Sequence, residues 1–311
     1  NDAVSFCTKG YHGFYLAFEE TGDPRFRLAA EAQARWSARY VHATINYMRC
    51  IGQVTEHPLA DLDRLSSYLV PNPPPPQTWA PPVGRYRCGG WMTLFERMVD
   101  LCGFDNLLVE LALGNPRLLE LRDRIVEHNV GCARSILTGG ADAVYFADDW
   151  GTQTGLMISP DLWRRVFLPA YRRQFAPVRE AGKHVFFHTD GYTIEILPDL
   201  VDAGVNVFWA DLTVNPLAQL RSSLGGKVCF QALTDVQFVL RTGSPEAVRQ
   251  HGRDLVAALG SFGGGVIGCS EVGADQPWEN VAAILRTFYD DGRYPLGFAW
   301  TGERAEVIRE G

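Results

Sequence analysis

Short apolar stretches recur along the chain from about residue 85, and most of them end in polar residues. Their length and their content of β-branched and aromatic residues are typical of buried strands. The six stretches are YRCGG (86–90), AVYFADD (143–149), HVFFHTD (184–190), VNVFWAD (205–211), KVCFQAL (227–233) and GVIGCSE (265–271). Because they are apolar almost throughout, they predict strands of a parallel sheet that is covered on both faces.

Segments with helical periodicity lie between these strands. In the segment 158–182, Ser159 is a candidate N-cap, Pro160 suits the first turn and Gly182 ends the apolar pattern. A second segment, 244–260, begins with the same Ser-Pro pair. Strands that alternate with helices predict an α/β fold with helices over the sheet.

Two parallel architectures fit this alternation, an open doubly wound sheet and a (β/α)8 TIM-type barrel. No GxGxxG turn follows the first strand, which speaks against a dinucleotide-binding sheet. Polar residues instead follow many of the strands, and in a barrel such residues meet at one mouth. They are Asp148, Asp149, His188, Asp190, Asp211, Cys269 and Glu271. We therefore predict a (β/α)8 barrel.

The proline-rich run PNPPPPQTWAPP (71–82) divides the chain. Residues 24–70 before it are rich in Arg and Ala and have a helical pattern, but they are too few to fold alone. We predict one domain over residues 1–311, with residues 24–82 as a helical and proline-rich excursion from the barrel.

Composition narrows the class of protein. The chain has 311 residues, 21% of them charged, and a net charge of -7, which argues against nucleic-acid binding. No apolar run reaches the length of a membrane span, and no signal peptide is visible. The seven cysteines are scattered without a CxxC pair, so we expect a reducing cytoplasm. The sequence leaves the oligomeric state open.

Four segments resemble the uroporphyrinogen decarboxylase superfamily. They are residues 89–108, 148–173, 181–207 and 263–281, in an order and spacing typical of that superfamily. It includes the decarboxylase and the zinc-dependent methyltransferases that serve corrinoid proteins or coenzyme M. The resemblance implies a TIM-type barrel, and it leaves the reaction open.

The methyltransferase branch has a metal motif, a His-x-Cys at one strand end and a later Cys. His188 matches the histidine, Cys269 matches the later cysteine, and Asp190 replaces the first cysteine. Asp211 falls near the position of a glutamate in the methionine synthase pattern. The resemblance thus implies a metal site of His188, Asp190, Asp211 and Cys269. Such N, S and O donors suit Zn²⁺, while the extra carboxylate also allows iron or manganese. Alternatively, His188 and Asp190 form a hydrogen-bonded pair without metal.

The segments WADLTVNP and GKVCFQALTD resemble the decarboxylase branch. However, the Arg-Gln-Ala-Gly-Arg motif of that branch is absent from the sequence, and its motif tyrosine falls on Arg97. Decarboxylation of uroporphyrinogen itself is therefore not expected.

Other polar and aromatic residues are candidates for substrate chemistry. Asp148, Asp149 and Glu271 are candidates for proton transfer or substrate orientation, although alternation turns either Asp148 or Asp149 away from the mouth. Arg97 either binds a substrate carboxylate or forms a solvated pair with Glu96. Trp150 and Trp209 are candidate substrate contacts, with the core as the alternative.

Together these features predict a metal-dependent transferase that moves a methyl or another small group to or from a small-molecule substrate. A corrinoid would take part only through a partner protein. The first alternative is a metal-free decarboxylase or lyase acting on a carboxylated substrate other than uroporphyrinogen. The second is a barrel that binds a ligand without catalysis.

Overall fold

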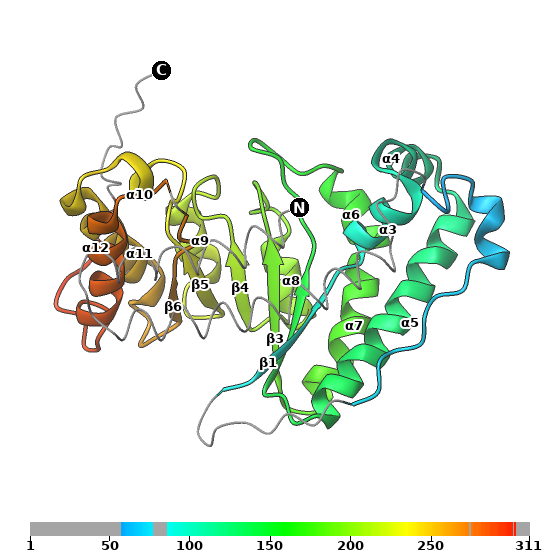
Figure 1. The fold of residues 1–311 in the computed structure, drawn as a ribbon, viewed down its shortest axis with the longest axis horizontal. Coiled ribbons are helices and arrows are strands. Elements are labelled where there is room, and N and C mark those ends of the chain that lie inside the picture. Colours follow the sequence, from blue (N-terminus) through cyan, green and yellow to red (C-terminus); the bar gives the residue numbers. More distant parts are fainter. Residues whose placement is uncertain (1–56, 77–85, 274, 301, 303–311) are drawn as a thin grey trace. The chain divides into compact units, whose positions relative to one another are not determined.

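Among the described residues, six strands form a sheet in the order β1-β2-β3-β4-β5-β6 (Figure 1). The computed structural model describes residues 57–76, 86–273, 275–300 and 302. Within these ranges the strands are Cys88–Met92 (β1), Ala143–Ala147 (β2), His184–Thr189 (β3), Val207–Ala210 (β4), Cys229–Leu233 (β5) and Val266–Cys269 (β6). All six predicted strands are confirmed. The registered pairs from β1 to β5 are parallel, as predicted.

Helices follow every strand along the chain. They are Phe95–Cys102 (α3), Phe104–Leu113 (α4), Pro116–Thr138 (α5), Pro160–Val166 (α6), Leu168–Glu180 (α7), Leu197–Ala203 (α8), Leu217–Leu224 (α9), Val239–Thr242 (α10), Pro245–Gly260 (α11) and Trp278–Asp290 (α12). A parallel sheet with a helix in each crossover is the TIM-type (β/α) fold that the sequence predicts. None of the described helices combines the length and the apolarity that a membrane span requires.

The chain divides into two compact units, and the boundary falls inside β5. Glu56–Gln231 forms one unit, and Ala232–Gly311 belongs to the other. The single domain over residues 1–311 stays a prediction. Residues 24–56 and 77–82 of the predicted excursion lie outside the described residues. The described part of the excursion holds a short 3-10 helix, Leu62–Ser67 (η1).

The predicted helix over residues 158–182 is interrupted. Ser159 caps its start, since the Ser159 hydroxyl accepts a hydrogen bond from the Leu162 N–H at 3.2 Å. The helix then breaks at Phe167 into α6 and α7. Pro169 explains the break, because a proline has no N–H to donate and its ring crowds the carbonyl four residues earlier. The start and the end are as predicted, and the continuity is not.

A row of phenylalanines forms the core on the helix-covered face of the sheet. The strand register places Phe146 beside Phe187, Phe187 beside Phe208, and Phe208 beside Phe230. All four are buried. Helix α7 covers Phe187 with the ring of Tyr171, 5.3 Å away between centroids. Because side chains alternate along a strand, the residues between these phenylalanines belong to the opposite face.

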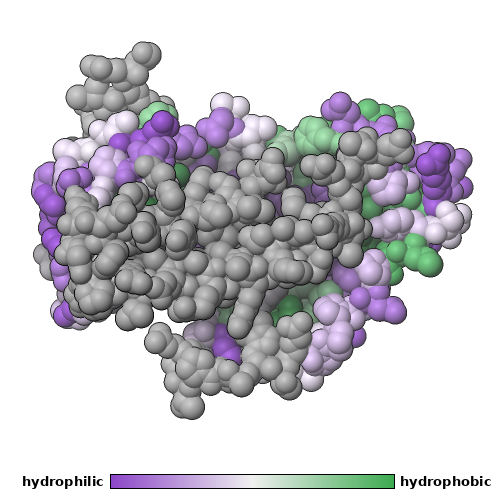
Figure 2. All heavy atoms as spheres, in the orientation of Figure 1, coloured by the Kyte–Doolittle hydropathy of each residue, from purple (hydrophilic) through white to green (hydrophobic). Residues whose placement is uncertain are grey.

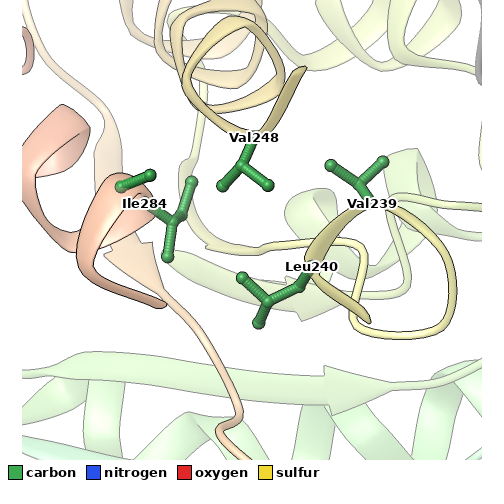
Figure 3. Packing of buried hydrophobic residues seen from close by; sticks show 5 residues of the cluster. Val239, Leu240, Val248 and Ile284 are labelled. Atoms are coloured by element: carbon green, nitrogen blue, oxygen red, sulfur yellow. The ribbon is translucent and has the colours of Figure 1, made fainter. Parts of the chain in front are cut away.

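The second unit has an apolar cluster of its own. Val239, Leu240, Val248 and Ile284 point toward one another from α10, α11 and α12 (Figure 3). The buried Asn280 side chain on α12 closes this cluster, because its amide donates hydrogen bonds to the carbonyls of Leu240 and Gly243.

The surface is mixed in polarity. Figure 2 shows hydrophilic residues together with scattered hydrophobic ones on the visible face. Three of the exposed apolar side chains, Phe104, Val109 and Leu113, belong to α4.

Two glycines allow the loops after β2 and β3 to touch. A Cβ on Gly191 would lie 2.3 Å from the carbonyl carbon of Gly151, and Gly191 has a φ of +77°. The Gly151 N–H donates to the Asp190 carbonyl at 3.1 Å across this contact. No larger residue fits there without moving one loop.

We therefore expect Gly191→Ala to lower the midpoint of thermal unfolding. The left-handed conformation alone costs an alanine about 1–2 kcal/mol, and the backbone clash adds to it. Gly155→Ala is the matched control, because Gly155 lies in the same loop region and a Cβ there meets no atom within 4 Å. Equal midpoints for the two variants would contradict the role of this contact.

Candidate functional site

The register between β2 and β3 brings polar side chains together beyond the strand ends. Ala147 on β2 pairs with His188 on β3. Asp149 and Asp190 each follow these residues by two positions, so all face the same side. The Asp190 N–H also donates to Asp149 Oδ1 at 2.9 Å, which ties the two loops together.

Asp149, His188 and Asp190 form the one potential metal-binding group found among the described residues. His188 Nε2 lies 3.4 Å from Asp149 Oδ1 and 3.6 Å from Asp190 Oδ1. One potential ligand atom from each residue lies within 4.8 Å of the other two. The His188 side chain is buried, while the Asp149 and Asp190 side chains are 40% and 51% exposed. The imidazole thus lies at the buried side of the group, and the two carboxylates lie at its solvent-exposed side.

Burial and the neighbouring carboxylates have opposite effects on the pKa of His188. Burial lowers the pKa of His188, but the interaction with Asp190 and the charges of Asp149 and Glu96 outweigh burial, so that the net pKa is raised. The other ring nitrogen, Nδ1, is buried and has no hydrogen-bond partner among the described residues. A buried imidazole with one unpaired nitrogen is uncommon in a purely structural role.

Glu96, in the first turn of α3, adds a third carboxylate. Its Oε1 accepts a hydrogen bond from the Asp149 N–H at 3.3 Å. Burial, together with the charge of Asp149, raises the pKa of Glu96 to about 7. Burial also raises the pKa of Asp149, and the charge of Asp190 adds to this, whereas His188 opposes it. No Lys or Arg of the described chain forms an ion pair with Glu96, Asp149 or Asp190.

Asp148, next to Asp149, has a different environment. Its carboxylate is buried and accepts hydrogen bonds from the N–H groups of Leu94 and Glu96 and from the Tyr171 hydroxyl, the last at 2.6 Å. Burial raises the pKa of Asp148, and the charge of Glu96 adds to it, while these hydrogen bonds act in the opposite direction. Leu94, the N-cap residue of α3, has no side-chain cap of its own, so Asp148, which directly follows β2, caps this helix.

Aromatic rings lie beneath the carboxylates. Trp91 on β1 contacts Tyr145, His188 and Trp209, with centroid distances of 5.1, 5.3 and 6.1 Å. The Trp209 ring lies edge-on to His188 at 4.6 Å. Tyr145 is joined to Gln231 by a hydrogen bond of 3.3 Å. These rings hold the imidazole between them.

Sequence reasoning missed Trp91 as a site residue. A register shift between Gly89 and Met92 breaks the simple alternation of β1, so its inward position cannot be counted from the strand start. The Gly-Gly pair before Trp91 was the available signal, because glycine inside a strand often marks a bulge.

The other predicted site residues have separate surroundings. Asp211 follows β4 and accepts a hydrogen bond from the Thr213 N–H at 2.9 Å, which forms a turn. Cys269 and Glu271 belong to the second unit, where the Cys269 carbonyl accepts a hydrogen bond from the Thr234 N–H at 3.0 Å. The structure does not include Asp211 or Cys269 in the group around His188. Their metal-binding roles, and the catalytic role of Glu271, stay predictions.

Arg97 and Trp150 have structural partners. Arg97 Nη1 lies 3.4 Å from Asp100 Oδ2 on the same helix. Trp150 is fully buried, stacks on Phe95 at 4.2 Å and donates to the Tyr171 hydroxyl at 2.8 Å. Trp150 is thus part of the core, the alternative that the sequence left open, whereas Trp209 borders His188.

A match to a family model shows which protein family the chain belongs to. The model of uroporphyrinogen decarboxylase (URO-D) matches residues 86–289, which contain every strand described above. The chain belongs to the URO-D family. No curated protein matches the chain.

Solved structures agree with a URO-D-like barrel. A methyltransferase from Methanosarcina mazei is similar with a TM-score of 0.53 and 18% identity, over 67% of this chain and 60% of that chain. The match therefore spans less than two thirds of that methyltransferase, and at this identity it shows the fold alone. A dihydropteroate synthetase is similar over 57% of this chain and 58% of that chain, with 14% identity and a TM-score of 0.33, too low to indicate a common fold.

The two neighbouring aspartates should respond differently to substitution. We expect Asp148→Ala to destabilise the protein by roughly 3 kcal/mol or more, because it leaves the buried Leu94 N–H, the partly buried Glu96 N–H and the buried Tyr171 hydroxyl without an acceptor. Asp149→Ala removes a carboxylate that is partly exposed and should cost much less stability. Chemical denaturation of both variants measures the difference. A larger loss for Asp149→Ala would contradict the capping role of Asp148.

Proposed function

We propose that this member of the URO-D family is a metal-dependent transferase that moves a methyl or another small group to or from a small-molecule substrate. The observation that supports the metal is the group of Asp149, His188 and Asp190, with a buried imidazole below two partly exposed carboxylates. The same-fold methyltransferase supports the transfer of a methyl group.

The donor atoms fit a divalent transition metal. One imidazole nitrogen and two carboxylate oxygens can bind Zn²⁺, and the oxygen-rich character also suits iron or manganese. Asp149 and Asp190 would neutralise a divalent ion, and the aromatic rings around His188 would fix the direction of its ring. Asp211 and Cys269 stay proposed as further ligands on the strength of the family motif alone.

When bound, the ion would supply a Lewis acid that keeps the attacking or accepting group of the substrate deprotonated at neutral pH. The residues of the chain do the remaining work in this proposal. Glu271 takes or gives a proton, because the metal would occupy Asp149, while Asp148 holds the first turn of α3 in position. The methyl donor is either a small methylated compound or a methylated corrinoid carried by a partner protein.

A metal-free lyase is the second candidate, and the name of the matching family model favours it. In this alternative Asp148 or Asp211 supplies a proton, and arginines such as Arg97 bind the substrate carboxylate. The hydrogen bonds that cap α3 occupy Asp148, so Asp211 is the better proton donor of the two.

Metal binding separates the two candidates. Protein stripped with EDTA should take up about one equivalent of Zn²⁺, Mn²⁺ or Fe²⁺ in a calorimetric titration checked by elemental analysis. We expect His188→Ala and the double variant Asp149→Asn/Asp190→Asn to lose at least tenfold in affinity, because each removes ligand atoms. Asp142→Asn is the control, since Asp142 is an aspartate of the same unit that pairs with Arg87 and Lys183.

The same titration on Asp211→Asn and Cys269→Ala measures their part in metal binding. Wild-type protein that takes up less than a tenth of an equivalent of each metal would overturn the metal-dependent proposal. Activity on a carboxylated substrate that persists in EDTA but is lost in Asp211→Asn would support the lyase instead.

A further inference from the structure

The inner face of the first unit is arranged in layers. Ala143, Phe186 and Val207 form an apolar cluster toward the base, where Tyr145 pairs with Phe186. A layer of rings and one imidazole comes next. Three carboxyl groups follow, two after the strand ends and one in the first turn of α3. We call Trp91, Tyr145 and Trp209 the aromatic layer, and Glu96, Asp149 and Asp190 the carboxylate rim. An apolar base below rings and acids is a graded surface that suits a ligand with both apolar and charged parts.

Trp91 is the open member of the aromatic layer. The ring packs against Tyr145, His188 and Trp209, yet 48% of Trp91 stays uncovered. Trp209 below it is buried. A tryptophan that is held by three neighbours and is still half open offers a rigid π surface to a ligand, and the face of tryptophan attracts cations more strongly than that of other aromatic residues.

The carboxylate rim favours a positively charged ligand. Asp149 Oδ1 and Asp190 Oδ1 lie 3.4 and 3.6 Å from His188 Nε2, and Glu96 adds a third carboxyl group at the Asp149 backbone. A divalent ion would balance Asp149 and Asp190, which leaves Glu96 to be matched by a proton or by a ligand cation. An anionic substrate would instead meet repulsion from the rim.

We propose that this site binds the methylated ammonium group of a small-molecule substrate, with the cation over the open face of Trp91 and beside the carboxylate rim. This inference rests on the proposed function, because a methylated ammonium carries the methyl group that the transferase would move. A quaternary ammonium has no N–H to donate, so rings and charge are enough to recognise it. The rim carboxylates could also accept hydrogen bonds from a primary ammonium, so the aromatic layer is the feature that favours a methylated one.

Choline and 3,3-dimethylbutan-1-ol are matched probes for this inference. They have nearly the same shape, but only choline carries a positive charge. Calorimetric titration of the full chain should give a choline affinity at least about tenfold above that of the neutral alcohol. Equal affinities would show a merely apolar site and would overturn the inference, as would the absence of choline binding at millimolar concentration.

Substitution of Trp91 identifies the surface that binds choline. We expect Trp91→Leu to weaken choline binding about 3- to 30-fold, from the usual strength of a cation over a tryptophan face. Trp91→Phe should keep part of the affinity. Tyr289→Leu is the control, because Tyr289 is an exposed aromatic of the second unit that already has Arg293 over its ring at 4.8 Å. An unchanged affinity in both Trp91 variants, with native circular dichroism, would overturn the assignment to Trp91.

The metal state separates this inference from the proposed function. Both probes are titrated into EDTA-stripped protein and into protein loaded with Mn²⁺. Metal uptake without a preference for choline in either state would remove the inference and leave the transferase proposal standing. A preference for choline in protein that binds no metal would support cation recognition and remove the metal from the proposed function.

Discussion

The parallel pairing of β2 with β3 is the constraint on which the site depends. It fixes Ala147 beside His188, and the pleat then turns Asp149 and Asp190 to the same side. The contact between Gly151 and Gly191 keeps the following loops close enough for the Asp190 N–H to reach Asp149. A shift of one strand by one residue would turn either Asp149 or Asp190 to the helix-covered face and separate the two carboxylates. The positions of three potential ligands therefore follow from one register.

The buried carboxyl group of Asp148 stabilises this arrangement. Asp148 has no access to solvent, and its oxygens accept hydrogen bonds from the start of α3 and from Tyr171 on α7. These bonds hold α3 so that Glu96 reaches the backbone of Asp149. Adjacent aspartates thus divide two tasks, since one stabilises the fold and the other faces the site. The hydrogen-bond donors offset part of the cost of burying Asp148, but burial still raises its pKa, as it raises the pKa values of Glu96 and Asp149.

Much of the fold could be predicted because its signals are local. Apolar runs with polar ends mark the strands, and the Ser-Pro pairs at Ser159 and Ser244 mark helix starts that the structure confirms. The break at Phe167 could not be read from periodicity, because the apolar pattern continues across it. The sequence also could not tell which of Asp148 and Asp149 faces the site. Alternation shows that two neighbouring side chains point to opposite faces, but not which of them points to the site. Trp91 escaped because a bulge shifts the count in β1.

The carboxyl groups around His188 would interact with a bound metal ion and with a cationic substrate alike. A site with three carboxylates and no partner arginine or lysine in the described chain is unstable as a set of bare anions, so each acid must be protonated or matched by a cation. Protonation satisfies Glu96 near neutral pH, in agreement with its pKa of about 7. A bound cation would compete with that proton, because positive charge beside a carboxylate lowers its pKa. Binding of either a metal or a methylated ammonium should therefore release protons from the rim, so the heat of binding should depend on the ionisation enthalpy of the buffer. A neutral ligand that packs only against Trp91 would leave this proton balance unchanged.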